Sequence, residues 1–403
     1  MAAQQPSPIT AEQAVAEALD KNIGILAERQ NIPIADARIL TAAIRPNPRL
    51  SIASDYMDWL RRGVTAENNA GPSEVSTRLD YTLEGGGKRQ RRIEVAELAK
   101  SVAELRLVDA IRLLTFSVQS AFTDVLAAKE SRALAQQNLH VFNDIIQVNS
   151  AKVRAGELAG VELVRTRVAR QQLENAVRQA ELRVTTAKNN LQYLLGRQSM
   201  DPNFDVMGSL RNDPQIVLLE ELKIMAAQKR PDLLAQRKDA ERLSADTRLQ
   251  IANGKIDYTL GTAFQYQYTY SNGRLFGLYL NIPLPVYDRN QGEIARAQRE
   301  AQQAQTRSLG LEASIRTEVE NAWQQYNTAK NLLEEIQRTL LEEARQVREI
   351  TEYSYRRGEA SFLEFLDAQR AYNDAIQSYN DARADYTRSL YLIDSVTGRS
   401  VNP

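Results

Sequence analysis

Hydrophobic and small residues recur at alternating spacings of three and four along two long stretches of this sequence. Such spacing is typical of a coiled coil, in which helices pack side by side along a narrow seam. In the second stretch large residues alternate with alanine or serine, which lets the helix axes approach closely. We therefore predict two sets of paired helices. The seam positions are Leu163, Thr166, Arg170, Leu173, Val177, Ala180, Val184, Ala187, Leu191 and Leu194, and then Phe365, Ala368, Tyr372, Ala375, Tyr379, Ala382, Tyr386, Ser389, Ile393 and Val396.

Glycine and proline are absent from four long stretches, which indicates helices of unusual length. These stretches are 88–155, 161–195, 311–357 and 359–397. At about 1.5 Å per residue the first would be roughly 100 Å long, far more than a globular domain can wrap. The helices must therefore pack against one another along their lengths.

The sequence is also a tandem duplication. The Gly-Glu pair at 156–157 recurs at 358–359, and the segment 195–197 is matched at 397–399, in both cases 202 residues later. A constant shift of this kind indicates two copies of one structural unit. Each copy is predicted to hold a helix, an irregular segment, a very long helix, a Gly-Glu turn and a returning helix.

The irregular segments alternate residue by residue, with apolar or aromatic side chains on one face and polar or small ones on the other. We predict strands at 50–60 and 75–83 in the first repeat, and at 258–270 and 275–284 in the second, with a turn at 271–273. By itself the alternation fits a soluble sheet with one wet face as well as membrane strands.

Geometry favours the membrane alternative. Four strands cannot close a barrel, and an open sheet would expose its edges and its apolar face to water. Three chains would supply twelve strands for a barrel with a polar lumen and twelve helical rods for a tube. The predicted fold class is an α+β membrane protein with long coiled-coil helices and four strands per chain.

Composition excludes several functions. The 403 residues carry 51 Lys and Arg against 51 Asp and Glu, so no nucleic-acid partner is expected. Cysteine is absent and His140 is the one histidine, which excludes disulfides, thiol catalysis and cysteine-based zinc sites. We expect no catalytic residues, no metal site and no cofactor, and the run Gly85-Gly86-Gly87 lacks the spacing of a phosphate-binding loop. The residues 1–4 lack the pattern of a signal peptide, which is consistent with a leader already removed.

The order of these elements resembles that of the TolC-like outer membrane efflux proteins, over residues 9–399. The entry and exit of the strands look most like the CzcC-like branch, which is paired with heavy-metal cation pumps. A departure is the absence of the N-terminal cysteine that anchors many members of that branch through lipid. The residues that carry the resemblance are the opening helix 10–19, Arg45-Pro46-Asn47-Pro48-Arg49-Leu50, Leu280-Asn281-Ile282-Pro283-Leu284-Pro285-Val286-Tyr287-Asp288-Arg289 and the two Gly-Glu turns.

The resemblance implies a homotrimer with a twelve-stranded outer-membrane β-barrel and a twelve-helix periplasmic α-barrel. It would be the passive exit duct of a tripartite efflux system, in contact with outer-membrane lipid, a periplasmic adaptor (membrane fusion) protein and an inner-membrane RND transporter. The alternative from the heptads alone is a soluble periplasmic scaffold or adaptor, which would have no use for duplicated aromatic-faced hairpins. The expected organisation is 1–46 for the N-terminal segment and first helix, 47–87 for the first β-hairpin, 88–196 for the first helical hairpin, 197–215 for an equatorial linker, 216–254 for the helix of the second repeat, 255–287 for the second β-hairpin, 288–398 for the second helical hairpin and 399–403 for the tail.

The two Gly-Glu turns are the first candidate functional positions. Glycine supplies the left-handed conformation that ends a helix, which explains these turns structurally. By resemblance the turns form the periplasmic end of the tunnel and meet the adaptor. The expected contact residues are Arg154, Gly156, Glu157, Leu158, Arg357, Gly358, Glu359 and Ser361.

The second candidate is a channel gate at the same end. Glu364 and Asp367 lie three residues apart on one helical face, a pair that is most often solvated surface. By resemblance they match the carboxylates of the narrowest ring, where six per trimer would attract cations. The links that close the tip in the family map to Tyr355 and Glu162. A basic residue often found after the second turn is Ala360 in this sequence.

Overall fold

The computed structural model describes residues 8–55, 74–213, 218–267 and 273–399. They fall into two compact units. One comprises Met1–Arg29, Arg106–Leu234 and Leu311–Pro403, and the other comprises Gln30–Leu105 and Ala235–Gly310. Each unit therefore draws on both sequence repeats.

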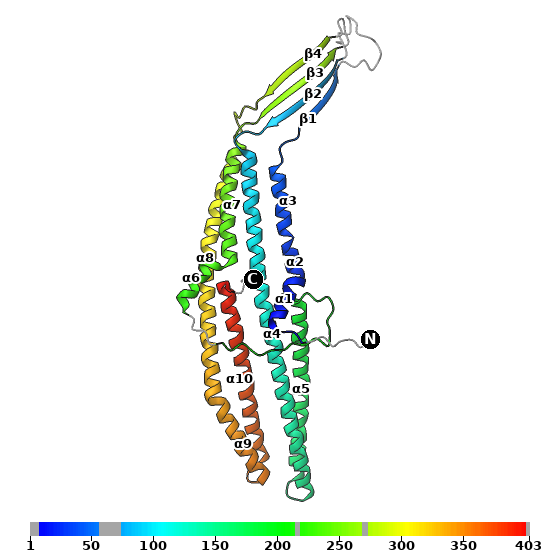
Figure 1. The fold of residues 1–403 in the computed structure, drawn as a ribbon. Coiled ribbons are helices and arrows are strands. Elements are labelled where there is room, and N and C mark those ends of the chain that lie inside the picture. The colour runs from blue at the N-terminus through cyan, green and yellow to red at the C-terminus, as the bar shows by residue number, and fades with distance from the viewer. Residues whose placement is uncertain (1–7, 56–73, 214–217, 268–272, 400–403) are drawn as a thin grey trace. The chain divides into compact units, whose positions relative to one another are not determined.

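Long helices dominate, as the glycine and proline pattern predicts. Helix α4 (Lys88–Arg154) has 67 residues and α8 (Gln291–Glu335) has 45, and both have residues in each unit. In the first unit α4 runs beside α5 (Gly160–Leu194) as a hairpin (Figure 1). The other helices are α1 (Ala11–Lys21), α2 (Ile23–Arg29), α3 (Asn31–Ala43), α6 (Leu219–Lys229), α7 (Pro231–Asn253), α9 (Leu341–Arg357) and α10 (Phe362–Thr397).

One predicted helix is interrupted. The stretch 311–357 has no glycine or proline, yet a π-helical turn, η1 (Ile336–Leu340), separates α8 from α9. A π turn holds one residue more than an α turn and shifts the faces of the helix that follows. The apolar core residues of α8 begin at Ile315, and the last core residue along this stretch is Ile336, inside the π turn.

Each hairpin of the first unit has its own apolar core, and several of the predicted seam residues lie in these cores. Phe365, Ala375, Tyr386 and Ile393 of α10 are buried as predicted, whereas Tyr372 is half-buried. Burying one stripe of each helix is what makes such long rods stable in pairs. The core of the α8–α10 hairpin includes Leu222, Ala226, Leu233, Ile315, Val319, Ala322, Tyr326, Tyr386, Leu390 and Ile393, and that of the α4–α5 hairpin includes Ala14, Ala18, Val118, Phe122, Val125, Leu191, Leu195, Phe204 and Val206.

The duplication is visible where each returning helix ends. Gly196 follows α5 and Gly398 follows α10, and both have a left-handed backbone, with φ of 77° and 74°. Each glycine lies against the backbone at the end of a short helix, α1 at Lys21 and α6 at Lys229. A side chain at either position would meet main-chain atoms, so glycine serves the same purpose in both repeats.

Ion pairs hold the segment between the repeats against helices α4, α5 and α10 of the same unit. Lys129 and Lys188 both reach Asp205 at 3.0 Å, and Arg211 binds Asp213 and Asp394 at 2.7 and 2.5 Å. Burial disfavours the ionised form of Asp205, but the hydrogen bonds from the two lysines outweigh burial and lower its pKa. The segment thus stays in place without regular secondary structure.

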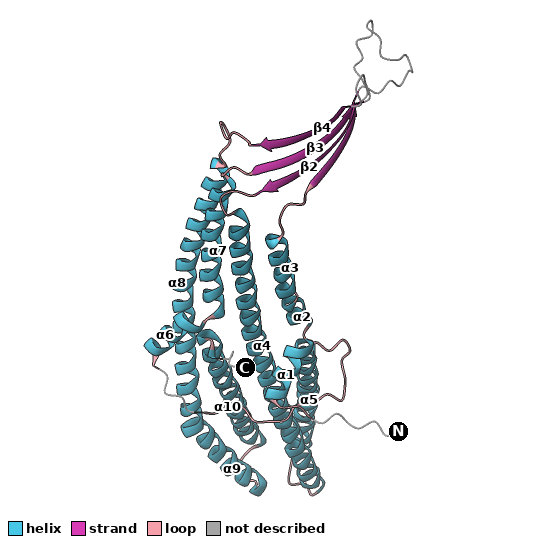
Figure 2. Cartoon of the chain, turned by 45° about the horizontal axis from the view of Figure 1, so that its top comes forward, coloured by secondary structure: helices cyan, strands magenta, loops and turns pink. Residues whose placement is uncertain are grey.

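The strands of the second unit form one antiparallel sheet, in the order β1-β2-β3-β4 (Figure 2). They are β1 (Arg49–Asp55), β2 (Glu74–Leu83), β3 (Tyr258–Gln267) and β4 (Gly273–Asn281). The predicted strand residues 56–60 and 268–270 and the turn residues 271 and 272 lie outside the described residues.

The register places most of the large apolar residues of the four strands on one face. Leu79 of β2 lies opposite Leu50 of β1 and Thr262 of β3, and Thr262 lies opposite Leu278 of β4. On the other face Arg78 binds Asp80 at 2.8 Å and lies over the ring of Tyr279. The apolar residues are the exposed ones, and the polar residues of β2 are partly covered. The sheet is therefore the reverse of one that packs an apolar face onto a protein core.

Of the helices in the described part of the chain, none is apolar enough over a sufficient length to cross a bilayer.

Candidate functional site: the ends of the two helical hairpins

The two hairpin turns lie at the same end of the first unit (Figure 1). Gly156 and Gly358 have φ of 76° and 83°, so the predicted left-handed conformation is confirmed at both. In each case the N–H that follows the glycine donates to a carbonyl five residues back, from Glu157 to Lys152 at 2.9 Å and from Glu359 to Ser354 at 2.9 Å. This is a Schellman ending, which satisfies the last carbonyls of α4 and α9.

The expected adaptor-contact residues are mostly on the surface. The side chain of Leu158 is half-buried, and the guanidinium of Arg357 lies over the ring of Tyr353 at 4.5 Å. A Cβ atom added to either glycine would have open space around it. The turns thus present a free surface in the single chain. The exposed members are Arg154, Gly156, Glu157, Arg357, Gly358, Glu359 and Ser361.

Glu364 has a structural role that sequence reasoning missed. Its carboxylate accepts a hydrogen bond from the backbone N–H of Ser361 at 2.7 Å, and its own N–H donates to Ser361 Oγ at 3.2 Å. This reciprocal pair is a capping box at the start of α10, and the Ser-x-x-Glu spacing would have revealed it. The bond from the Ser361 N–H lowers the pKa of Glu364. Asp367 is exposed, with Arg370 3.9 Å away.

Tyr355 is buried and connects two hairpins. Its hydroxyl donates to Asn149 Oδ1 of α4 at 2.6 Å, and Asn149 Nδ2 donates to Thr166 Oγ1 of α5 at 2.9 Å. Thr166 in turn donates to the backbone carbonyl of Glu162. Burial raises the pKa of Tyr355, so its hydroxyl stays protonated as a donor. The chain of hydrogen bonds joins α9, α4 and α5.

The side chain of Glu162 lies close to this series of hydrogen bonds but does not bond with Tyr355. Its carboxylate pairs with Arg165 one turn further along α5, at 2.8 Å. The structure therefore brings Tyr355 together with Asn149 instead of with the expected acid. No signal in the sequence marks Asn149, because it is one of several polar residues on the face of a long helix.

Aromatic rings surround the Tyr355 hydrogen bond. The ring of Tyr355 stacks on Phe365 with centroids 5.2 Å apart, and Phe362 and Phe142 complete the cluster. Lys152 lies over the Tyr355 ring at 5.6 Å and donates to the carbonyl of Arg356 at 3.2 Å. The apolar surroundings strengthen the buried hydrogen bond and make its loss costly.

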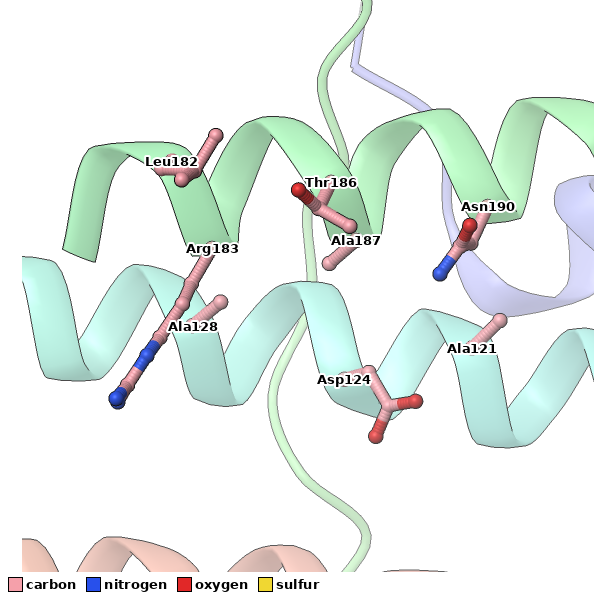
Figure 3. A pocket seen from close by; sticks show the side chains of 8 residues that line it. All are labelled: Ala121, Asp124, Ala128, Leu182, Arg183, Thr186, Ala187 and Asn190. Carbon is pink, nitrogen blue, oxygen red and sulfur yellow. The ribbon is translucent and has the colours of Figure 1, made fainter. Parts of the chain in front are cut away.

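Away from this cluster, the contact between α4 and α10 is polar. Arg388 reaches Asp124 at 2.9 Å, and Arg383 reaches Glu130 at 3.1 Å. Asp124 also borders a pocket of about 380 Å³ between α4 and α5, whose walls include alanines together with polar and charged side chains (Figure 3). The two hairpins are thus joined by apolar packing at their ends and by ion pairs further along. The other residues that line the pocket are Ala121, Ala128, Leu182, Arg183, Thr186, Ala187 and Asn190.

Comparison with known proteins gives the family. The profile of the family described as "Outer membrane efflux protein" matches residues 14–197 and 224–399, one match for each repeat. The cobalt-zinc-cadmium resistance protein CzcC of Cupriavidus metallidurans is 26% identical over 97% of this chain and 90% of its own. A membrane protein of Pseudomonas aeruginosa and the CusC channel have similar folds, with TM-scores of 0.81 and 0.79 at 19% and 18% identity, each over 96% of this chain and 92% of their own.

These matches confirm the resemblance inferred from the sequence, and the alternative of a soluble scaffold is set aside. The fold of long helices with a four-stranded sheet is that of the channels in this family. Because the family profile covers both repeats, the chain belongs to the outer membrane efflux protein family and is an efflux channel of the outer membrane that extends into the periplasm, not an enzyme.

Proposed function

We propose that three copies of this chain form the exit duct of a tripartite pump that exports heavy-metal cations. Channels of the family are trimeric and work in tripartite systems. A periplasmic adaptor and an inner-membrane RND transporter are the proposed partners, and outer-membrane lipid surrounds the sheet. The duct conducts passively, since the transporter supplies the energy.

The observation that carries the proposal is that the sheet exposes its apolar face and partly covers its polar face. Leu278, Phe276 and Ile52 are among its most exposed side chains, whereas Arg78 and Asp80 are partly covered on the opposite face. Lipid favours such an outer face, and water favours the inner one. Within the described residues no strand lies beside the outer edges of β1 and β4, and equivalent strands of neighbouring copies would satisfy them.

Exposed apolar stripes on the helices support assembly with further copies. On α5, Val161, Val164 and Val168 are exposed at spacings of three and four. On α9, Ile350 and Tyr353 are exposed in the same way. Stripes of this kind are costly in water and are typical of a helix that packs against another helix in an oligomer.

The segments have separate proposed roles. The β-hairpins 47–87 and 255–287 lie in the outer membrane, and the helical hairpins 88–196 and 288–398 form the periplasmic tunnel. The exposed turns meet the adaptor, and their near-identity in both repeats gives six similar contact surfaces per trimer. Within the second turn and α10, Glu364 and Asp367 form the carboxylate ring of the gate.

We expect Tyr355→Phe to loosen the closed gate. The change keeps the aromatic packing but removes the hydrogen bond to Asn149, which leaves Asn149 Oδ1 without its donor. An unsatisfied buried polar group costs about 1–3 kcal/mol. Single trimers in planar bilayers should show higher conductance or more frequent opening.

Tyr353→Phe is the matched control, because Tyr353 lies two residues away on α9 and its side chain is exposed. It should leave conductance unchanged. If the two variants behave alike, the Tyr355–Asn149 bond has no part in closure.

The proposed cargo rests on similarity to the metal-resistance protein CzcC and on the carboxylates at the gate. A host that lacks its own outer-membrane channels should gain resistance to cobalt, zinc or cadmium when this chain is expressed with its cognate adaptor and transporter. Resistance should be lost when the channel alone is omitted. Resistance to organic drugs without any to metals would refute the cargo and leave the channel role intact.

A further inference from the structure

Every residue of the segment from 281, the last residue of β4, to 289 is exposed. Three of its large apolar side chains are among the most exposed of the described chain, with Leu284 at 79%, Val286 at 61% and Tyr287 at 89%. All of this segment lies in the second unit, together with the sheet. Exposed apolar side chains clustered at one place mark an interaction surface.

Two prolines and two hydrogen bonds restrict the backbone of this segment. Pro283 and Pro285 fix their own φ angles and have no N–H to extend the β4 ladder. The N–H of Val286 donates to the Leu284 carbonyl at 2.8 Å, and the Arg289 side chain donates to the Pro285 carbonyl at 3.2 Å. Figure 2 shows the segment leaving the sheet as a loop before α8 begins. The apolar side chains are therefore presented by a defined backbone.

The corresponding segment of the first repeat has no such surface. After β2 the chain continues as Glu84-Gly85-Gly86-Gly87-Lys88. Glu84 pairs with Arg92, and the Lys88 ammonium reaches Asp257 at 2.7 Å. The exposed apolar loop of the second repeat therefore has no counterpart directly after β2.

The position of the loop points to the membrane boundary as its partner. The outward face of β4 carries Phe276, Leu278 and Leu280, and the exposed side chains of Leu284 and Val286 follow shortly after the strand ends. Charge resumes immediately afterwards, at Asp288 and Arg289. Tyrosine beside such a border is typical of the lipid headgroup level.

A pocket of about 320 Å³ lies behind the loop and carries both signs of charge. Lys255 is exposed there, whereas the Lys88 side chain is almost fully buried against Asp257. Asp288 borders the same pocket. A lining with ammonium and carboxylate groups together suits the phosphate and ammonium of a zwitterionic phospholipid headgroup.

We propose that the loop 283–287 is a lipid anchor at the periplasmic leaflet of the outer membrane. Leu284 and Val286 enter the boundary between acyl chains and headgroups, Tyr287 lies among the headgroups, and the pocket receives a zwitterionic phospholipid headgroup. Three anchors per trimer fix the depth at which the sheet sits. The proposal rests on the placement of the sheet in the membrane.

The absence of cysteine allows a direct test, because each introduced cysteine is the single labelling site. Nitroxide labels at Leu284→Cys and Tyr287→Cys are measured in trimers reconstituted into phosphatidylethanolamine and phosphatidylglycerol bilayers. A label that is accessible to dissolved oxygen lies in lipid, and a label that is accessible to a water-soluble nickel complex lies in solvent. Leu278→Cys, at 77% exposure on β4, is the membrane control, and Leu40→Cys, at 69% on α3, is the helix control.

We expect the label at 284 to lose access to the nickel complex and to resemble the label at 278, with the label at 287 intermediate. Labels at 284 and 287 that match the label at 40 would overturn the anchor while leaving the sheet in the membrane. A label at 284 shielded from both reagents would mean that a neighbouring copy covers the loop, which also overturns it. If the label at 278 itself is in water, the membrane placement of the sheet fails as well.

The headgroup pocket is tested separately with Lys255→Gln. Phosphorus relaxation of the lipid by a label at Tyr287→Cys should weaken when this variant is combined with the label. An unchanged relaxation rate would remove the pocket from the proposal.

Discussion

Alanine at Gly196 is expected to destabilise the protein far more than alanine at Gly156. Both glycines are left-handed, with φ of 77° and 76°, so each substitution carries a conformational cost of about 1–2 kcal/mol. At Gly156 the added Cβ would have open space. At Gly196 it would lie 2.3 Å from the Lys21 carbonyl oxygen and 2.9 Å from Asn22 Cα.

The close atoms at Gly196 belong to the backbone and cannot rotate away. The Asn22 side chain also donates to the Leu194 carbonyl at 2.9 Å, which fixes the end of α1 to the end of α5. Relieving the clash must move one helix end, at a further cost of about 1–3 kcal/mol.

The midpoint of thermal unfolding of the detergent-solubilised trimer, followed by circular dichroism, should therefore fall much more for Gly196→Ala than for Gly156→Ala. Gly398→Ala should also lower it more than Gly358→Ala, since its Cβ would lie 2.9 Å from the Lys229 carbonyl oxygen. Equal shifts within each pair would show that the close backbone approach does not contribute.

Replacing Glu364 by Gln together with Asp367 by Asn is expected to abolish the cation preference of the channel. Three copies would bring six carboxylates to a narrow opening, where they attract cations at close range. Moderate salt should screen them only partly, because the charges act within a few ångströms of the passing ion. Planar-bilayer recordings should show loss of cation selectivity and of block by multivalent cations.

The structure makes these substitutions mild for folding. Glutamine at position 364 can still accept the hydrogen bond from the Ser361 N–H, so the capping box of α10 is retained. Asp367 is exposed and its nearest cation, Arg370, is 3.9 Å away. The trimer and its helix content should therefore be preserved.

A matched control removes two charges elsewhere. Glu293→Gln with Glu300→Gln neutralises two exposed carboxylates of α8 that pair with Arg296. This control should keep the selectivity of the parent channel. If it loses selectivity to the same extent, or if the gate variant keeps it, then Glu364 and Asp367 are ordinary solvated helix surface.

The amino-acid sequence alone determined most of the secondary structure from residue spacing, the duplication from a constant shift, and the family from the order of the elements. The seam through Phe365 and Ile393 follows from spacings of three and four, and the sheet faces follow from strict alternation, as at Leu79 and Leu278. The left-handed turns at Gly156 and Gly358 were also predictable, because glycine adopts that conformation at little cost. The seam, the sheet faces and the turns each depend on residues close together in the chain, whereas the duplication is read from a constant shift of 202 residues.

Only the tertiary structure decided which distant residues meet. Tyr355 bonds with Asn149, 206 residues away, because the mutual register of α4 and α9 sets that contact, and no local pattern specifies the register between two hairpins. The backbone approach at Gly196 arises in the same way, from packing against a partner, and the π turn at Ile336–Leu340 also appears only in the structure. Alternation shows that a strand has two faces, but only the assembled sheet reveals that its apolar face is the exposed one.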